Sequence, residues 1–383
     1  MSGVRHAGWQ RPVLIGLGLQ LAVIGLFALS YDAYDFHVYA LGGRAVQHDQ
    51  QLYEFHWGQH GFTYPPFAAA AFVPFTAVPL ALARLLWDAA SVAALALATR
   101  ATARLAGRRP DPLELAALTA AGLLLEPVWH TLFLGQINLL LLAAVLVDVE
   151  RIARGRTAGV GIGVAAAVKL TPAIFILLLV LAGRRRSAAL AAATAAAATA
   201  IGALVAPHAS WQYWTGYFAD LHRVGSATYA SNQSIHGALA RAFGAGSAWE
   251  VVLALSVGVV GLVTAARLAR RADWLAAAAV TGVTGLLVSP ISWSHHWVWV
   301  IPALAVLARE GTRSRLAAAG GYALFVLAPI WWPAPARGLD GVATLESNAY
   351  ALAGLAFVVY AARAGARSRA RTRRLPAPVP VPV

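Results

Sequence analysis

Long apolar segments that alternate with clusters of arginine constrain this chain more than any other feature. Residues 13–30 form the first such segment, and residues 82–105 form another that ends in Arg100 and Arg104. A helix needs about 20 apolar residues to cross a bilayer. Only 12% of the residues are charged, whereas soluble domains carry roughly 25%. We therefore predict an all-α polytopic membrane protein.

The distribution of arginine predicts which side of the membrane each segment end faces, because Arg and Lys are retained in cytoplasmic loops. An uncleaved first segment with its N-terminus inside puts residue 31 outside the cytoplasm. The alternative is a cleaved signal peptide, because residues 28–30 resemble a cleavage site. The order of apolar segments and arginine clusters along the chain predicts about 12 crossings of the membrane, with both termini cytoplasmic. The arginines outside or at the outer interface are Arg44, Arg84, Arg223, Arg241 and Arg337.

Two stretches are too short to cross a bilayer as single straight helices. Residues 67–80 contain two prolines, and we predict an interfacial or re-entrant helix there. Residues 157–182 form a hairpin of two short arms, broken at 169–172. Such short or broken helices are typical of segments that line a cavity instead of facing lipid.

We predict a single integral-membrane domain over residues 1–374 in the plasma membrane. Its two main extracytoplasmic loops are residues 31–66 and 207–249, and residues 375–383 form a disordered, proline-rich cytoplasmic tail. The net charge of +14 is assigned to cytoplasmic loops and not to a nucleic-acid partner. The chain has no cysteine, which excludes disulfides and thiolate chemistry. The oligomeric state is left open.

Polar and aromatic residues gather after the first apolar segment, and Asp35 is the candidate catalytic base among them. A carboxylate in an aromatic pocket can accept a proton from a sugar hydroxyl as that hydroxyl attacks an anomeric carbon. One base is enough for a direct, inverting displacement. Asp32 lies three residues away and can share the same helix face, so it remains the alternative base. The rings expected around Asp35 are those of Phe36, Tyr39, Tyr53 and Tyr64.

Lys169 is the one lysine of the chain. It falls at the turn of a hairpin whose two ends are both cytoplasmic, in or near the outer half of the membrane, where an ionisable residue is a functional candidate. We expect a phosphate leaving group as its partner, and assign Arg84 and either His295 or His296 to the same phosphate. Adjacent helical residues point about 100° apart, so the two histidines do not converge on one ion. We predict neither a metal nor a cofactor.

Further polar residues on the outer side are candidates for substrate binding. Trp293 can stack on a sugar face or anchor the membrane interface. Asn232, Gln233 and Glu126 suit the recognition of hydroxyl groups; alternatively, they cap loops. The remaining candidates are Asp32, His37, Tyr39, Tyr64, His130, Gln136 and Asn138. The chain has no P-loop and no Rossmann glycine motif, which argues against a nucleotide-sugar donor.

Taken together, these motifs resemble glycosyltransferase family 87, the polyprenyl-phosphate-mannose-dependent mannosyltransferases of actinobacteria with a GT-C fold. The motifs are short, and their order and spacing over most of the chain make the resemblance specific. They are Asp35-Phe36-His37-Val38-Tyr39, Leu52-Tyr53, Phe62-Thr63-Tyr64-Pro65-Pro66-Phe67, Gly135-Gln136-Ile137-Asn138, Lys169-Leu170-Thr171-Pro172, Asn232-Gln233-Ser234 and Ser289-Pro290 with His295-His296.

The resemblance implies an enzyme that inverts a β-linked polyprenyl-phosphate-mannose donor and forms an α-(1→2) linkage. The implied acceptors are glycolipids such as phosphatidylinositol mannosides or lipomannan. The implied catalytic base is the acid of a DxxVY-type motif, which matches Asp35.

Three other functions remain open, of which one is a ligase that depends on a lipid-linked sugar. A transporter or flippase of a lipid-linked sugar predicts internal repeats and acids in the middle of spans. The polar motifs instead gather on one face, and we assign no Asp or Glu to the middle of a span, which favours an enzyme. A GT-C enzyme that transfers another sugar, such as arabinose, is the second alternative.

Overall fold

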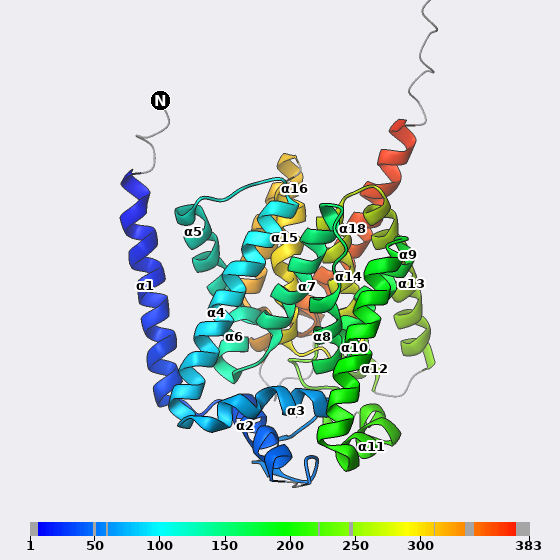
Figure 1. Cartoon of the computed structure of the whole chain (residues 1–383). Helices are drawn as coiled ribbons and strands as arrows, with labels where there is room; N and C mark the ends of the chain where they lie inside the picture. Colours follow the sequence, from blue (N-terminus) through cyan, green and yellow to red (C-terminus); the bar gives the residue numbers. More distant parts are fainter. Residues whose placement is uncertain are drawn as a thin grey trace, which may run out of the picture.

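The chain folds into a bundle of α-helices (Figure 1). The computed structural model describes residues 7–48, 51–58, 60–220, 223–244, 248–309, 311–333 and 341–372. Within these ranges the one sheet is an antiparallel hairpin of β1 (His56–Trp57) and β2 (His60–Gly61). The all-α class is therefore confirmed. The tail predicted at 375–383 lies outside the described residues.

Among the described residues, 5 helices are long and apolar enough to cross a membrane, and two bent pairs raise the number to as many as 7. These helices identify a multi-pass membrane protein. They do not confirm the predicted 12 crossings or the GT-C fold. The five helices are α1 (Ala7–Ser30), α4 (Leu80–Leu105), α10 (Arg185–Val205), α13 (Ala248–Arg270) and α16 (Thr312–Leu327); the pairs are α5 (Pro112–Leu123) with α6 (Glu126–Leu134), and α17 (Gly341–Ser347) with α18 (Ala349–Thr372).

The predicted break at 169–172 is present. Helix α8 (Val160–Val168) ends at Lys169, and a 3₁₀ turn, η2 (Thr171–Ala173), leads into α9 (Ile174–Leu181). Pro172 has no N–H to donate, so α8 cannot continue through it. The other short elements are α2 (Tyr34–Gln47), α3 (Pro66–Phe72), η1 (Val73–Ala77), α7 (Asn138–Ala153), α11 (Pro207–Thr215), η3 (Tyr217–Ala219), α12 (Ile235–Phe243), α14 (Trp274–Val288), η5 (Ser294–Trp299), α15 (Val300–Ala308) and η6 (Pro329–Trp331).

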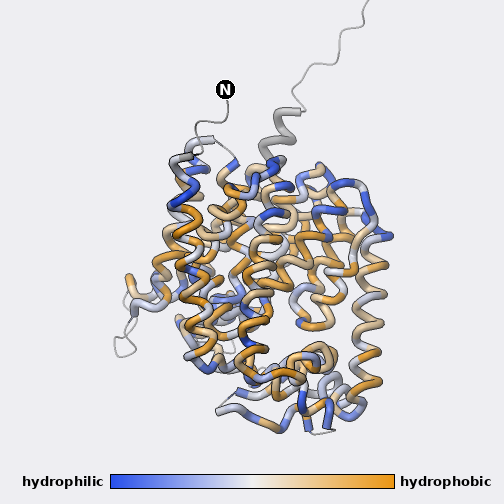
Figure 2. The backbone as a smooth tube through the Cα atoms, turned by 60° about the vertical axis from the view of Figure 1, so that its left-hand side comes forward, coloured by the Kyte–Doolittle hydropathy of each residue, from blue (hydrophilic) through white to orange (hydrophobic). Residues whose placement is uncertain are grey.

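The two ends of the bundle differ in character. Helices α2, α3 and α11 lie across one end, the α2–α3 end, which includes the stretch 67–80 that was predicted to be interfacial (Figure 1). At the opposite end lie the start of α1, the end of α18 and the arginine-rich connections, such as residues 106–111 and 182–186. A hydrophobic band separates the two ends (Figure 2).

Helices α8 and α10 pack with their backbones in close contact. A Cβ atom at Gly163 of α8 would lie 2.4 Å from the carbonyl oxygen of Ala191 in α10. Small residues permit such close approach of membrane helices. The contact fixes α8, and with it Lys169 at the end of this helix.

A buried ion pair lies in α4, toward the start of this helix. Asp88 is in α4, and its Oδ2 accepts a hydrogen bond from Arg84 Nε at 2.9 Å. The i,i+4 spacing puts both side chains on one face of the helix, where each is only 5% exposed. Asp88 is the seventh residue of the predicted span 82–105, so it does not lie at the middle of that span.

Candidate active site

Asp35 lies in the first turn of α2, immediately after the end of α1. Ala33 has an extended backbone and begins the helix, so the carboxylate of Asp35 sits near the positive end of the helix dipole. Asp35 is partly buried. Burial raises the pKa of its carboxyl group, whereas a hydrogen bond from Gln136 and the nearby charges of His60 and Lys169 act in the opposite direction.

A cluster of two phenols and an amide faces Asp35. The Tyr39 hydroxyl lies 2.9 Å from the Tyr64 hydroxyl, and both lie within 2.9 Å of the Gln136 Oε1 atom. Tyr39 is one helical turn after Asp35, so both project from the same side of α2. We call Tyr39, Tyr64 and Gln136 the Tyr–Gln cluster. This cluster brings together three segments that are distant in the sequence, beside the Asp35 carboxylate.

Gly135 determines where Gln136 lies. It ends α6 in the left-handed conformation, with φ +71. A Cβ atom there would lie 2.5 Å from Cβ of Phe36 and 2.9 Å from Nη1 of Arg84. The carbonyl of Gly135 also accepts a hydrogen bond of 2.8 Å from Trp87 Nε1. Glycine is therefore required by both its backbone conformation and the lack of space.

Lys169 approaches the same cluster from the other side. Its Nζ donates to Asn138 Oδ1 at 3.1 Å and to His296 Nε2 at 2.8 Å, and it lies 5.5 Å from the centre of the Tyr64 ring. These partners are an amide and an imidazole, and no acid forms an ion pair with Lys169 within the described ranges. The ammonium group is thus arranged to receive an anionic ligand.

The rings of His295 and His296 lie edge-on to each other, with 4.7 Å between their centres, and each contacts a different further partner. His296 contacts Lys169, whereas the ring of His295 packs edge-on against His130 at 5.3 Å between ring centres. Within the described part of the chain, neither ring nitrogen of His295 has a hydrogen-bond partner, although the residue is only 4% exposed. The His295 carbonyl is held at 3.0 Å by both Thr131 and Asn138.

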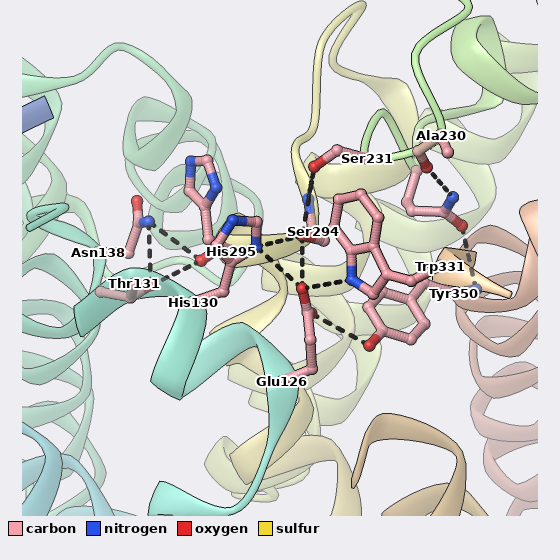
Figure 3. Close-up of polar contacts among 11 residues, drawn as sticks. Glu126, His130, Thr131, Asn138, Ala230, Ser231, Ser294, His295, Trp331 and Tyr350 are labelled. Carbon is pink, nitrogen blue, oxygen red and sulfur yellow. Dashed lines mark hydrogen bonds and ion pairs between the residues drawn. The ribbon is translucent and has the colours of Figure 1, made fainter. Parts of the chain in front are cut away.

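Glu126 lies at the bend between α5 and α6 and is fully buried. Figure 3 shows the side chains that converge on it from distant helices. Both carboxylate oxygens accept hydrogen bonds from the protein, which favours the alternative that Glu126 fastens loops. The donors are His130 Nδ1 at 2.9 Å, Ser294 Oγ at 2.8 Å, Trp331 Nε1 at 3.1 Å and Tyr350 Oη at 3.1 Å.

Asn232 and Gln233 also fasten loops. The Asn232 side chain bonds to the backbones of Ala227, Pro290 and Ser292, at 2.9 to 3.2 Å. The Gln233 amide nitrogen donates to the carbonyls of Ala230 and Ser347, and its oxygen accepts from the backbone N–H groups of Tyr350 and Ala351. Because these side-chain groups are all used within the protein, the geometry favours loop fastening over hydroxyl recognition.

The contacts of Arg84 and Trp293 in the described chain are with residues other than Lys169. In the described chain, Arg84 bonds to Asp88 and to the Leu132 carbonyl and lies over the ring of Phe36, at 5.9 Å. Trp293 packs edge-on against Tyr229 at 6.0 Å between ring centres, and its backbone pairs with Asn232. The structure therefore does not bring Arg84 together with the two histidines.

Asp32 and Asp35 have different surroundings. Asp32 bonds to His37 Nδ1, and 55% of its side chain is exposed. The His37 ring stacks on Trp57 at 4.0 Å. Asp35, by contrast, faces the Tyr–Gln cluster. This contrast favours Asp35 over Asp32 as the base.

Several residues of the site region were missed by the sequence analysis. Asp88 was detectable from its i,i+4 spacing with Arg84 inside a predicted span. His60, Ser294 and Tyr350 carry no local signal, because their partners lie 25 to 224 residues away in the sequence.

Comparisons with known proteins decide the family. Residues 62–290 match the model of glycosyltransferase family 87. The chain belongs to this family. It is therefore a glycosyltransferase, and the resemblance that its motifs indicated is confirmed. The matched segment includes Tyr64, Gln136 and Lys169, whereas Asp35 precedes it and His295 follows it.

Curated relatives align over most of the family 87 chain. One, from Mycobacterium tuberculosis, is 34% identical over 333 residues, covering 83% of this chain and 77% of the relative. It is named polyprenol-phosphate-mannose-dependent alpha-(1-2)-phosphatidylinositol pentamannoside mannosyltransferase. Another, from Mycolicibacterium smegmatis, is 36% identical over 335 residues, covering 77% and 75%, and its name specifies a phosphatidylinositol mannoside instead. No solved structure matches the chain.

Proposed function

We propose that this glycosyltransferase moves mannose from polyprenyl-phosphate-mannose to a glycolipid of the phosphatidylinositol mannoside or lipomannan type, with formation of an α-1,2 linkage. The observation that carries the proposal is that Asp35 and Lys169 face the Tyr–Gln cluster from two sides. The names of the relatives support the choice of donor sugar, acceptor and linkage.

Asp35 acts as the general base in the proposed reaction. The carboxylate takes the proton of an acceptor hydroxyl as its oxygen bonds to the anomeric carbon of mannose. The bond between that carbon and the phosphate oxygen breaks at the same time, with inversion. The departing phosphate carries the negative charge to Lys169. The ammonium group of Lys169 and the adjacent His296 side chain receive it, and Asn138 orients the ammonium group through its Oδ1 atom.

The ionised form of Asp35 is the reactive form. Burial alone would favour the neutral acid, but the hydrogen bond from Gln136 and the charge of Lys169 stabilise the carboxylate. The Tyr39 and Tyr64 hydroxyls hold the acceptor oxygen of Gln136, which leaves its amide N–H₂ for Asp35. The Tyr–Gln cluster therefore orients the base, and its amide favours the charged form of the carboxyl group against the effect of burial.

The reaction takes place on the extracytoplasmic side in this proposal. Arginine-rich connections gather at one end of the bundle, and Lys and Arg are retained in the cytoplasm. The α2–α3 end, which carries Asp35, is then extracytoplasmic, and both termini are cytoplasmic. The broken α8–η2–α9 segment supports a GT-C-type arrangement, in which short helices line the site.

The proposal is tested with purified protein in lipid nanodiscs, labelled polyprenyl-phosphate-mannose and a phosphatidylinositol mannoside. We expect a labelled glycolipid from which an α-1,2-specific mannosidase releases the label. Transfer from polyprenyl-phosphate-arabinose in place of the mannose donor would contradict the choice of sugar. Movement of the donor between leaflets without any product would contradict the transferase reaction.

A further inference from the structure

Helix α8, which carries Lys169 at its end, packs between α7 and α10 (Figure 1). Glycine residues bring its backbone close to both neighbours. A Cβ atom at Gly161 would lie 2.4 Å from the carbonyl oxygen of Ala144 in α7. On the other side, a Cβ atom at Gly159, directly before α8, would lie 2.5 Å from the carbonyl oxygen of Ser187 in α10. These contacts fix the distance of α8 from its neighbours, whereas its position along its own axis requires directional bonds.

Asp148 of α7 provides such bonds at the start of α8. Its Oδ2 atom accepts a hydrogen bond of 2.9 Å from the backbone N–H of Ile162, and the N–H groups of Gly161 and Gly159 also bond to this carboxyl group. The first N–H groups of a helix have no partner within the helix and favour an acidic side chain nearby. Asp148 is only 6% exposed and forms no ion pair within the described ranges. Its carboxyl group therefore serves to hold α8.

Glu150 lies two residues further along α7 and shows the contrast. It is equally buried, at 6% exposure. Its carboxylate pairs with the side chains of Arg154, at 2.6 Å, and Arg104, at 3.3 Å. Glu150 is thus held by arginine side chains, whereas Asp148 is bonded to the backbone at the start of α8. Glu150 is therefore a matched control for Asp148.

The other end of α8 is bonded to the same helix. Lys169 Nζ donates to Oδ1 of Asn138, which is the first residue of α7. Asn138 and Asp148 are ten residues apart, or about 15 Å along α7. Ile162 and Lys169 are seven residues apart, or about 10 Å, and the long lysine side chain spans the remainder. A shift of α8 along its axis would therefore move the Lys169 ammonium group away from Asn138 and His296.

We propose that Asp148 is a positioning residue for Lys169, because it holds the start of α8 and so sets the height of the ammonium group in the site. An ammonium group has three N–H donors. Asn138 and His296 take two of those of Lys169 in the described chain, which leaves one for the phosphate of the lipid-linked donor. This inference rests on the phosphate role of Lys169 in the function proposed above.

Substitutions of Asp148 in the full-length protein in nanodiscs test the inference. Asp148→Ala removes the acceptor atoms, and Glu150→Ala is the matched control. We expect Asp148→Ala to lower kcat/KM for polyprenyl-phosphate-mannose about tenfold, the lower end of the effect of losing a charged hydrogen bond to the phosphate. The KM for the phosphatidylinositol mannoside acceptor should stay unchanged, and Glu150→Ala should keep both values of the wild-type protein. Equal effects of the two substitutions, or an equal rise of KM for both substrates, would overturn the inference.

A double-mutant cycle distinguishes the positioning of Lys169 from a general loss of structure. If Asp148 acts through Lys169, adding Asp148→Ala to Lys169→Ala should leave kcat/KM for the donor at the value of Lys169→Ala alone. A further tenfold loss in the double variant would contradict the inference. Asp148→Asn keeps the volume and one acceptor oxygen, so it tests the inference even where Asp148→Ala does not fold. We expect it to lower the same kcat/KM about threefold, and a wild-type value would make Asp148 a purely structural residue.

Binding of farnesyl phosphate, a short polyprenyl phosphate, tests the inference without any transfer of sugar. Its Kd should rise about tenfold in Asp148→Ala and stay at the wild-type value in Glu150→Ala. If the wild-type protein transferred no mannose, the proposed function would fail, whereas this binding measurement would still test the role of Asp148. An unchanged Kd in Asp148→Ala would overturn the inference.

Discussion

Replacing Gly135 by alanine should displace Asp35, the proposed base, without a direct contact to its side chain. The new methyl group would start 2.5 Å from Cβ of Phe36, whereas ordinary contact begins at 3.4 Å, so α2 or α6 must move by about 1 Å. A misplacement of about 1 Å can reduce an enzymatic rate about 100-fold. Phe36 is next to Asp35 in the sequence, and Gly135 is next to Gln136. Moving Phe36 away from Gly135 therefore separates the Asp35 carboxylate from the Gln136 amide.

The free-energy change can be worked from the same contact. A left-handed backbone costs an L-residue roughly 1–2 kcal/mol, and overpacking typically adds about 1–3 kcal/mol. We therefore expect Gly135→Ala to lose about 2–5 kcal/mol of stability, and kcat to fall about 100-fold in the protein that remains folded. Thermal unfolding in nanodiscs and mannosyl transfer at saturating donor measure the two effects separately.

Gly107 provides the matched control for this substitution. It also has a left-handed backbone, with φ +79, but no heavy atom lies within 4 Å of the position that a Cβ atom would take. Gly107→Ala should therefore lose only the stability that the left-handed backbone costs, about 1–2 kcal/mol, and its kcat should be unchanged. Equal effects of the two substitutions on kcat would refute the argument that Gly135 positions Asp35.

Three further predictions concern other parts of the site. Lys169→Ala should lower kcat/KM for the donor roughly 10- to 100-fold, because a charged hydrogen bond to the phosphate is lost, and should leave the KM for the acceptor unchanged. A kcat/KM for the donor equal to that of the wild-type protein would contradict the phosphate role of Lys169. Because burial raises the pKa of Asp35, activity should be lost as the pH falls through a value above that of an ordinary carboxyl group, in a pH–rate profile that Asp32→Asn leaves unchanged. Glu126→Gln should destabilise the protein by about 1–3 kcal/mol in thermal unfolding, whereas the more exposed Glu114→Gln should change its stability by less than about 0.5 kcal/mol.

The position of the candidate site follows from the sequence because its main signals are local. Asp35 directly follows a membrane-length segment, and Lys169 sits where Pro172 ends an already short helix. Arginine clusters mark the opposite end of each hairpin. These features depend on neighbours within a few residues, so a single sequence is enough to recognise them.

The partners within the site could not be predicted in the same way. Gln136 meets Tyr64 across 72 residues, and Glu126 meets Tyr350 across 224 residues. No local pattern distinguishes such a buried, paired carboxylate from one that faces substrate, and Glu126 was accordingly given two alternatives. The predicted number of about 12 crossings is not confirmed, because helices such as α8 and α9 are too short for their length to identify them as spans.

The most direct test of the proposed reaction is the turnover of Asp35→Asn beside Asp32→Asn. The amide keeps the shape of the carboxylate but cannot take a proton, and a general base contributes roughly 10²–10⁴-fold to a rate. We predict that Asp35→Asn loses that factor in mannosyl transfer while its affinity for polyprenyl-phosphate-mannose is retained, and that Asp32→Asn keeps most of the activity. Full turnover of Asp35→Asn, or loss of turnover in Asp32→Asn alone, would contradict the assignment of Asp35 as the base.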